Sequence, residues 1–103
     1  WDYDALPGAP VDVSAGVISA AGLFRLVEAC RAVAGGCAQA DRWTPLAKRM
    51  LTAALERVNR AEPIGYLGDQ VYTLGGTQTW DDDGELVFGL NYAVEAIALS
   101  RRH

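Results

Sequence analysis

The stretch over residues 15–24 is apolar at almost every position, and this feature most limits what the chain can fold into. Ser19 is the only polar side chain within it. The pattern predicts a helix over residues 14–34, which Gly35 and Gly36 would end. A helix that carries no polar stripe must be buried on all sides, so this one needs protein around it.

The two ends of this helix carry the polar residues that the middle lacks. Asp12 or Ser14 can accept the first free backbone amides as an N-cap. Arg25, Glu28 and Arg31 recur at three-residue spacing and predict one polar stripe in the second half. We interpret this stripe as a face exposed to solvent or a contact between helices.

Two further helices follow. Thr44 as N-cap and Pro45 at the first helical position predict a second helix that runs to about residue 61. Its apolar face would hold Leu46, Met50, Ala54 and Val58, with charged residues elsewhere, so one side stays wet. A third helix is predicted over residues 86–101, and it is again apolar nearly all the way round.

The segment between the second and third helices is rich in glycine. Residues 71–74 and 78–80 predict a short β-hairpin across Gly75 and Gly76. Residues 81–84, three aspartates and a glycine, then predict a turn. A calcium loop is the alternative, although the alternating ligands and distal glutamate of such loops are missing.

A chain of 103 residues cannot cover two helices of this kind alone. Domains of this size bury roughly 60 to 65% of their surface, so most of their elements keep one side in water. We therefore expect an all-α fold that needs further segments of the same protein or a tight oligomer. The order buried, half-exposed, buried is typical of concentric helical barrels.

Composition excludes several other classes. The formal net charge of −4 and the dispersed basic residues argue against nucleic acid as a partner. No uncharged apolar run reaches the roughly 18 residues of a membrane span, and no basic segment precedes an apolar one as in a signal peptide. We thus expect a cytoplasmic protein with no membrane partner, which starts at Trp1 as a processed or trimmed piece.

The chain has two cysteines, Cys30 and Cys37, and one histidine, His103. This set predicts no metal site. A bridge between the cysteines is geometrically possible, but we expect two free thiols, with Cys30 packed as a small hydrophobic residue.

Several motifs then suggest a family. The loop Trp1-Asp2-Tyr3-Asp4-Ala5, the helix start Asp12-Val13-Ser14-Ala15 and the last helix with Phe88-Gly89-Leu90-Asn91-Tyr92 and Glu95-Ala96 follow one another in order. Together they resemble the C-terminal part of the unsaturated glucuronyl hydrolases, glycoside hydrolase family 88. The likeness covers essentially all 103 residues. It departs from the family where Val13 replaces a serine, and Glu85 would repel a sulfated substrate.

The resemblance implies an (α/α)6 barrel of six helical hairpins, with residues 1–103 as its C-terminal helical-hairpin segment. It implies release of a 4,5-unsaturated uronic acid from oligosaccharides by hydration of the vinyl-ether double bond, without a cofactor. An aspartate of the family protonates this bond, and water adds to the neighbouring carbon. The two key aspartates lie in the family's N-terminal half, so no residue here is assigned as catalytic and the chain is incomplete alone.

The resemblance also suggests residues that line the sugar site. Trp1 would stack on a pyranose ring while Asp2 and Asp4 accept hydroxyl hydrogen bonds, unless this loop is only structural. Asp12 and Ser14 would be helix caps near the pocket. Asn91 and Tyr92 would contact the substrate or make a buried structural hydrogen bond. The competing hypothesis is a non-enzymatic helical module that binds carbohydrate or oligomerises.

Overall fold

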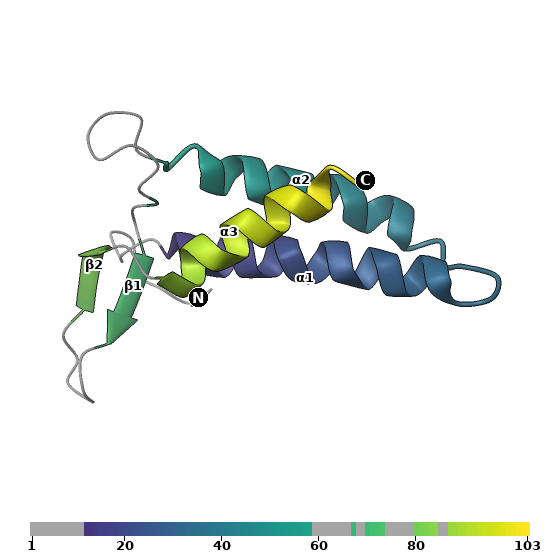
Figure 1. Ribbon diagram of the computed structural model, residues 1–103, viewed down its shortest axis with the longest axis horizontal. Coiled ribbons are helices and arrows are strands. Elements are labelled where there is room, and N and C mark those ends of the chain that lie inside the picture. The colour runs from purple at the N-terminus through teal and green to yellow at the C-terminus, as the bar shows by residue number, and fades with distance from the viewer. Residues whose placement is uncertain (1–11, 59–66, 68–69, 74–79, 85–86) are drawn as a thin grey trace.

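The computed structural model describes residues 12–58, 67, 70–73, 80–84 and 87–103 (Figure 1). Its elements are α1 (Val13–Ala32), α2 (Ala40–Leu55), β1 (Gln70–Thr73), β2 (Trp80–Gly84) and α3 (Val87–Ser100). The predicted helical fold with one short hairpin is confirmed. Figure 1 shows the three helices packed together, with the hairpin beside one end of them.

α1 lies at the centre of the helical packing. The largest core cluster joins its Phe24, which is fully buried, to residues of both other helices. The members of this cluster are Ala20, Ala21 and Phe24 of α1, Ala47 and Leu51 of α2, and Ala96 and Leu99 of α3. Small residues at most of these positions let α2 and α3 approach α1 closely.

α1 begins and ends close to where the sequence predicts. Asp12 is the N-cap, since its carboxylate accepts from the backbone N–H of Ser14 at 3.1 Å. The helix ends at Ala32, two residues before the predicted end. Gly35 and Gly36 follow with φ values of 91° and 61°, which only glycine adopts without strain, and they turn the chain back toward α2.

The prediction for the start of α2 is wrong. The helix begins at Ala40, and Pro45 lies inside it at an exposed position, where the ring removes one backbone donor from the helix. Thr44 is no N-cap, because its hydroxyl donates back to the Ala40 carbonyl at 3.0 Å. The helix also ends at Leu55 instead of residue 61.

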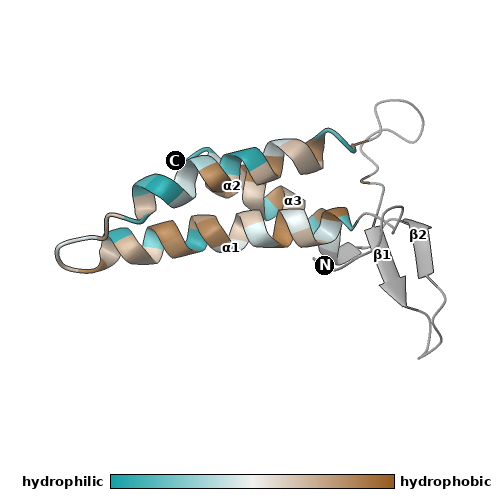
Figure 2. Ribbon diagram, turned by 180° about the vertical axis from the view of Figure 1, so that it is seen from behind, coloured by the Kyte–Doolittle hydropathy of each residue, from teal (hydrophilic) through white to brown (hydrophobic). Residues whose placement is uncertain are grey.

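α2 is amphipathic as predicted, but its buried face is shifted. Ala40, Ala47, Leu51 and Ala54 are buried, whereas Leu46 is 38% exposed. Ala40, Ala47 and Ala54 pack against α1 in the core clusters, where their small side chains permit close packing. In Figure 2 polar residues are frequent along α2, while α1 is mostly apolar.

The predicted hairpin forms, but its second strand spans Trp80–Gly84 and not residues 78–80 as predicted. β1 and β2 pair antiparallel, with Tyr72 opposite Asp81 and Thr73 opposite Trp80. Residues 81–84 therefore belong to strand β2 and do not form the predicted turn. Pairing with β1 holds this acidic segment in an extended conformation.

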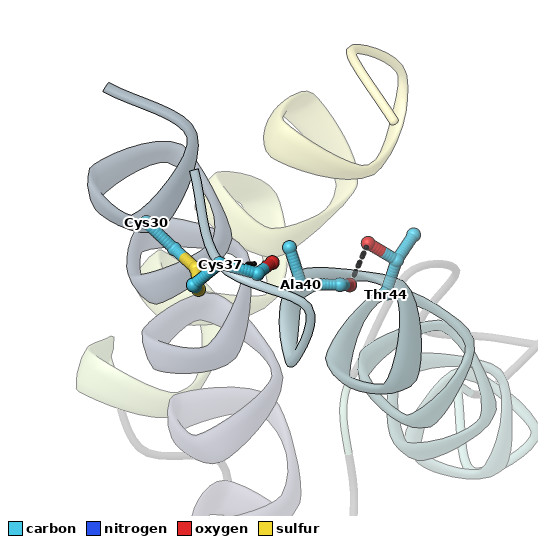
Figure 3. Close-up of a disulfide and its surroundings, with 4 residues drawn as sticks. All are labelled: Cys30, Cys37, Ala40 and Thr44. Carbon is cyan, nitrogen blue, oxygen red and sulfur yellow. Dashed lines mark hydrogen bonds between the residues drawn. A yellow bond between two sulfur atoms is a disulfide. The ribbon is translucent and has the colours of Figure 1, made fainter. Parts of the chain in front are cut away.

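The disulfide between Cys30 and Cys37 contradicts the expected free thiols (Figure 3). Their Cα atoms lie 5.6 Å apart, within the usual range for a bridge. The turn at Gly35 and Gly36 brings Cys37 back beside the last part of α1, where Cys30 is 7% exposed. The bridge closes the connection between α1 and α2.

The chain does not cover α1 and α3 on all sides, as the sequence analysis expects for 103 residues. Ile18 and Leu26 of α1 are 38% and 45% exposed, and Leu90 and Val94 of α3 are 39% and 61% exposed. The chain thus covers one side of each apolar helix and leaves another side uncovered, as its length requires.

α1 is long and apolar enough to cross a membrane by length and composition. However, 44% of the apolar stretch of α1 that meets this criterion is buried inside the structure. Arg25 on this helix also pairs with Glu95 of α3, with 2.9 Å between a guanidinium nitrogen and a carboxylate oxygen. These contacts are those of a core helix, so we treat α1 as one.

Candidate functional site

α1 and α3 begin at the same end of the helical bundle (Figure 1). Near their starts, Val13 and Val17 of α1 share a buried cluster with Ala93 of α3. Further along, Arg25 contacts Glu95 and Glu28 contacts Arg102, so the two helices run in the same direction. Their N-terminal ends, which carry the positive end of each helix dipole, therefore lie near one another. This end of the bundle is the candidate site.

Asp12 and Ser14 cap α1 at this end. The Asp12 carboxylate accepts from the Ser14 backbone N–H and, at 2.6 Å, from the Ser14 hydroxyl. Ser14 is 4% exposed, so its hydroxyl serves this contact. The predicted cap role is confirmed for Asp12, while Ser14 acts as its hydrogen-bond donor.

We expect Asp12→Ala to lower the free energy of unfolding by about 1 kcal/mol, because two donors lose their shared acceptor. Urea unfolding followed by far-UV circular dichroism measures this change. Asp41→Ala, an exposed acidic residue in the first turn of α2 that does not act as the cap, is the matched control. An equal loss in both variants would contradict the cap role.

Asn91 and Tyr92 occupy successive positions near the start of α3 but face different surroundings. The Asn91 side chain is exposed. Tyr92 is half-buried and packs against two of the core clusters. Tyr92 thus has a packing role, and Asn91 is open to a ligand. Their predicted contact with substrate stays a prediction. Trp1, Asp2 and Asp4 lie outside the described residues.

A groove of about 290 Å³ lies between the start of α1 and the end of α2. Its lining consists of Val13, Gly16, Met50, Ala53, Ala54 and Arg57. The walls are apolar, and part of the Arg57 side chain contributes to them. An apolar wall of this kind suits the apolar face of a ring.

Sequence reasoning missed this groove. The sequence pattern places Arg57 among the charged residues of the second helix and Gly16 within the apolar stretch over residues 15–24. The groove depends on which turn of α2 faces which turn of α1, and the shifted buried face of α2 decides this. No pattern within either segment specifies that pairing.

A separate polar cluster joins the C-terminal end of α3 to the other helices. The His103 side chain is 5% exposed and stacks on Phe24, with 5.8 Å between the ring centroids. One imidazole nitrogen, Nδ1, lies 2.9 Å from an Arg31 nitrogen, and Lys48 donates to the His103 carbonyl at 2.8 Å. Because these contacts tie α3 to α1 and α2, the cluster is structural.

The polar stripe of α1 is an inter-helix contact, one of the two predicted alternatives. Arg25 donates to Glu95 through two nitrogens, at 3.0 and 2.9 Å. The hydrogen bond and charge of Glu95, followed by the charge of Glu28, raise the pKa of Arg25 above its ordinary value. Since Arg25 is exposed, the pair aligns α1 and α3 and contributes little to stability.

Within the described ranges, no group of three or more histidine, cysteine or acidic side chains could hold a metal ion. The chemistry that the candidate site offers is binding, through the N-terminal end of α3, the exposed Asn91 amide and an apolar groove. No family model, curated protein or solved structure matches this chain.

Proposed function

We propose that this chain is the C-terminal segment of a glycoside hydrolase that releases 4,5-unsaturated uronic acid from oligosaccharides. The observation that carries the proposal is the arrangement of the helices. α1 and α3 run in parallel, begin at one end and keep uncovered apolar sides, while α2 between them in sequence keeps a polar side. Inner and outer helices of an (α/α)6 barrel alternate in this way.

In this proposal the candidate site binds the uronic acid ring and orients it. The N-terminal end of α3 attracts the carboxylate, because the backbone amides of a first helical turn carry partial positive charge, whereas the start of α1 is already capped by the Asp12 carboxylate. The apolar groove offers a wall for the sugar ring, and Asn91 offers an amide to the sugar hydroxyls. The remaining hairpins supply the aspartate that protonates the double bond at C4, and water then adds at C5.

The test of these roles uses the protein that joins this segment to the remaining hairpins. We expect Asn91→Ala to raise the KM for an unsaturated disaccharide roughly 2- to 10-fold with little change in kcat, since one hydrogen bond to the ground state is lost. Loss of the ultraviolet absorbance of the double bond measures the rate. Arg101→Ala, an exposed position near the other end of α3, is the control. An unchanged KM in the Asn91 variant would contradict the binding role.

The sequence analysis predicts a cytoplasmic location, and the disulfide argues against it. Bridges persist in oxidising compartments and are rare in the cytosol. The link between Cys30 and Cys37 therefore favours a protein of an oxidising compartment. Titration of thiols in protein taken from its native cells distinguishes the two, because two reactive thiols would support the cytoplasm.

The second candidate, a non-enzymatic helical module that oligomerises, is favoured by one observation. Ile18 and Leu26 of α1 are exposed apolar side chains, and another copy can cover them as a neighbouring hairpin would.

A further inference from the structure

The first turn of α2 is held by its contacts with α1 and by little in its own sequence. Gln39 is the N-cap residue, but its side chain makes no capping hydrogen bond. Asp41 suits the positive end of the helix dipole, an exposed contact of small effect. Pro45 stands inside the helix, where its ring removes a backbone donor and disfavours the helical conformation of Thr44. The local sequence therefore opposes a start at Ala40.

The same segment contains a second helix start that the structure does not use. Thr44 followed by Pro45 is a strong local signal, because threonine accepts backbone amides as an N-cap and proline is favoured at the first helical position. In the structure the Thr44 hydroxyl instead donates to the Ala40 carbonyl at 3.0 Å (Figure 3). The chain thus encodes an early start at Ala40 and a late start at Pro45, and contacts with α1 decide between them.

Packing and the disulfide supply those contacts. Ala40 is buried in a cluster with Val27 and Cys30 of α1. Trp43 and Cys37 are half-buried and pack against that cluster. The bridge from Cys30 to Cys37 ties the chain to α1 just before Ala40, so the first turn reaches the cluster at a smaller cost in chain entropy. Cutting the bridge removes the covalent part of this restraint.

We propose that this disulfide is a redox switch that sets where α2 begins. While the bridge between Cys30 and Cys37 is closed, α2 begins at Ala40. Once the bridge is reduced, α2 begins at Pro45, with Thr44 as its N-cap. The proposal goes beyond the glycosidase proposal and does not rest on it.

The switch needs a thiol reductant, and the burial of the two cysteines sets the order of its steps. Cys37 is half-buried, whereas Cys30 is 7% exposed, so a thiolate of the reductant attacks the Cys37 sulfur. The bond between the two cysteine sulfurs breaks, and Cys30 leaves as a thiolate that takes up a proton. A second thiolate of the reductant attacks the reductant's own sulfur in the mixed disulfide and releases Cys37, which is protonated in turn. The reductant gives up two electrons and two protons and becomes a disulfide.

The two states differ at one end of the bundle. Opening lengthens the connection after α1 from residues 33–39 to residues 33–44 and uncovers Val27, which the first turn of α2 covers while the bridge is closed. Ala47 and Leu51, which pack against α1 in the largest core cluster, belong to α2 in both states. The switch therefore opens one end of the helical hairpin and leaves the rest of the bundle folded.

Backbone NMR and amide hydrogen exchange of the chain, with and without dithiothreitol, test the proposal. The Arg42 and Trp43 amides donate to the Gln39 carbonyl in the early start, both at 3.0 Å. We expect reduction to speed their exchange by roughly tenfold or more and to remove the helical Cα shifts of residues 40–43. Amides over residues 50–54 should be unchanged, because both states keep them helical.

Pro45→Ala separates the switch from simple fraying of an untethered helix end. Without the proline the late start loses its signal, so the reduced variant should keep residues 40–43 helical and lose the redox response. Thr52→Ala is the matched control, since it raises helix propensity at an exposed position of α2 away from the start and should respond as the unaltered chain does. The double variant Cys30→Ala and Cys37→Ala should show the late start without any reductant.

Three outcomes would overturn the proposal. They are a reduced chain that keeps residues 40–43 helical, a reduced chain that also loses the protection of residues 50–54, and a redox response in Pro45→Ala equal to that of the unaltered chain. Failure here leaves the hydrolase proposal standing, because that proposal is read from the turnover of an unsaturated uronide.

Discussion

Phe24→Ala is expected to lower the free energy of unfolding by about 3–5 kcal/mol, the largest effect of any single replacement considered for this chain. Phe24 is fully buried and sits in the cluster that joins all three helices. Alanine would leave a cavity there and remove the ring on which His103 stacks. For a chain of this size the loss corresponds to a fall in melting temperature of about 15 °C or more.

Urea unfolding, followed by far-UV circular dichroism at one fixed protein concentration, measures the Phe24 effect. Leu46→Ala is the matched control, since Leu46 is also a large apolar residue of a helix but is 38% exposed. We expect it to cost about 1 kcal/mol or less. Equal losses at the two positions would mean that Phe24 is not the centre of the core.

Removal of the disulfide is expected to cost about 2–3 kcal/mol. The bridge joins residues seven positions apart, so it restricts the unfolded chain by closing a short loop. The double variant Cys30→Ala and Cys37→Ala removes it without placing a new hydroxyl at the buried position of Cys30. The shift of the urea midpoint measures the loss.

Reductant supplies the control for the disulfide. Dithiothreitol should lower the stability of the unaltered chain by a similar amount and leave the double variant unchanged, because only the former has a bridge to lose. If the unaltered chain does not respond and shows two reactive thiols when folded, the bridge is not part of the native protein.

The helices are predictable from the pattern of apolar residues, because many positions together determine which side of a helix is buried. The apolar run over residues 15–24 identifies the first helix, and the alternation of an apolar and a charged side identifies the second. The pattern also predicts that α1 and α3 remain partly uncovered, since that follows from length alone. Glycines at a chain reversal are equally local, and Gly35 and Gly36 end α1 as expected.

What the sequence does not predict depends on contacts between segments. Thr44 and Pro45 form a strong local start signal, yet packing of Ala40 against Val27 and Cys30 extends α2 one turn earlier. The same packing brings Cys37 to Cys30. The groove at Arg57 likewise depends on the pairing of two helices. For the site, the Asp12 cap was predictable from its position before an apolar run, whereas Arg57 was not.

The most direct test of the central proposal is the ultraviolet absorbance of an unsaturated uronic acid disaccharide. The protein that joins this segment to the remaining hairpins should abolish this absorbance as water adds to the double bond. The chain of residues 1–103 should leave it unchanged, because the proposal places the catalytic aspartate in those other hairpins. Loss of absorbance with residues 1–103 alone, or none with the larger protein, would contradict the account.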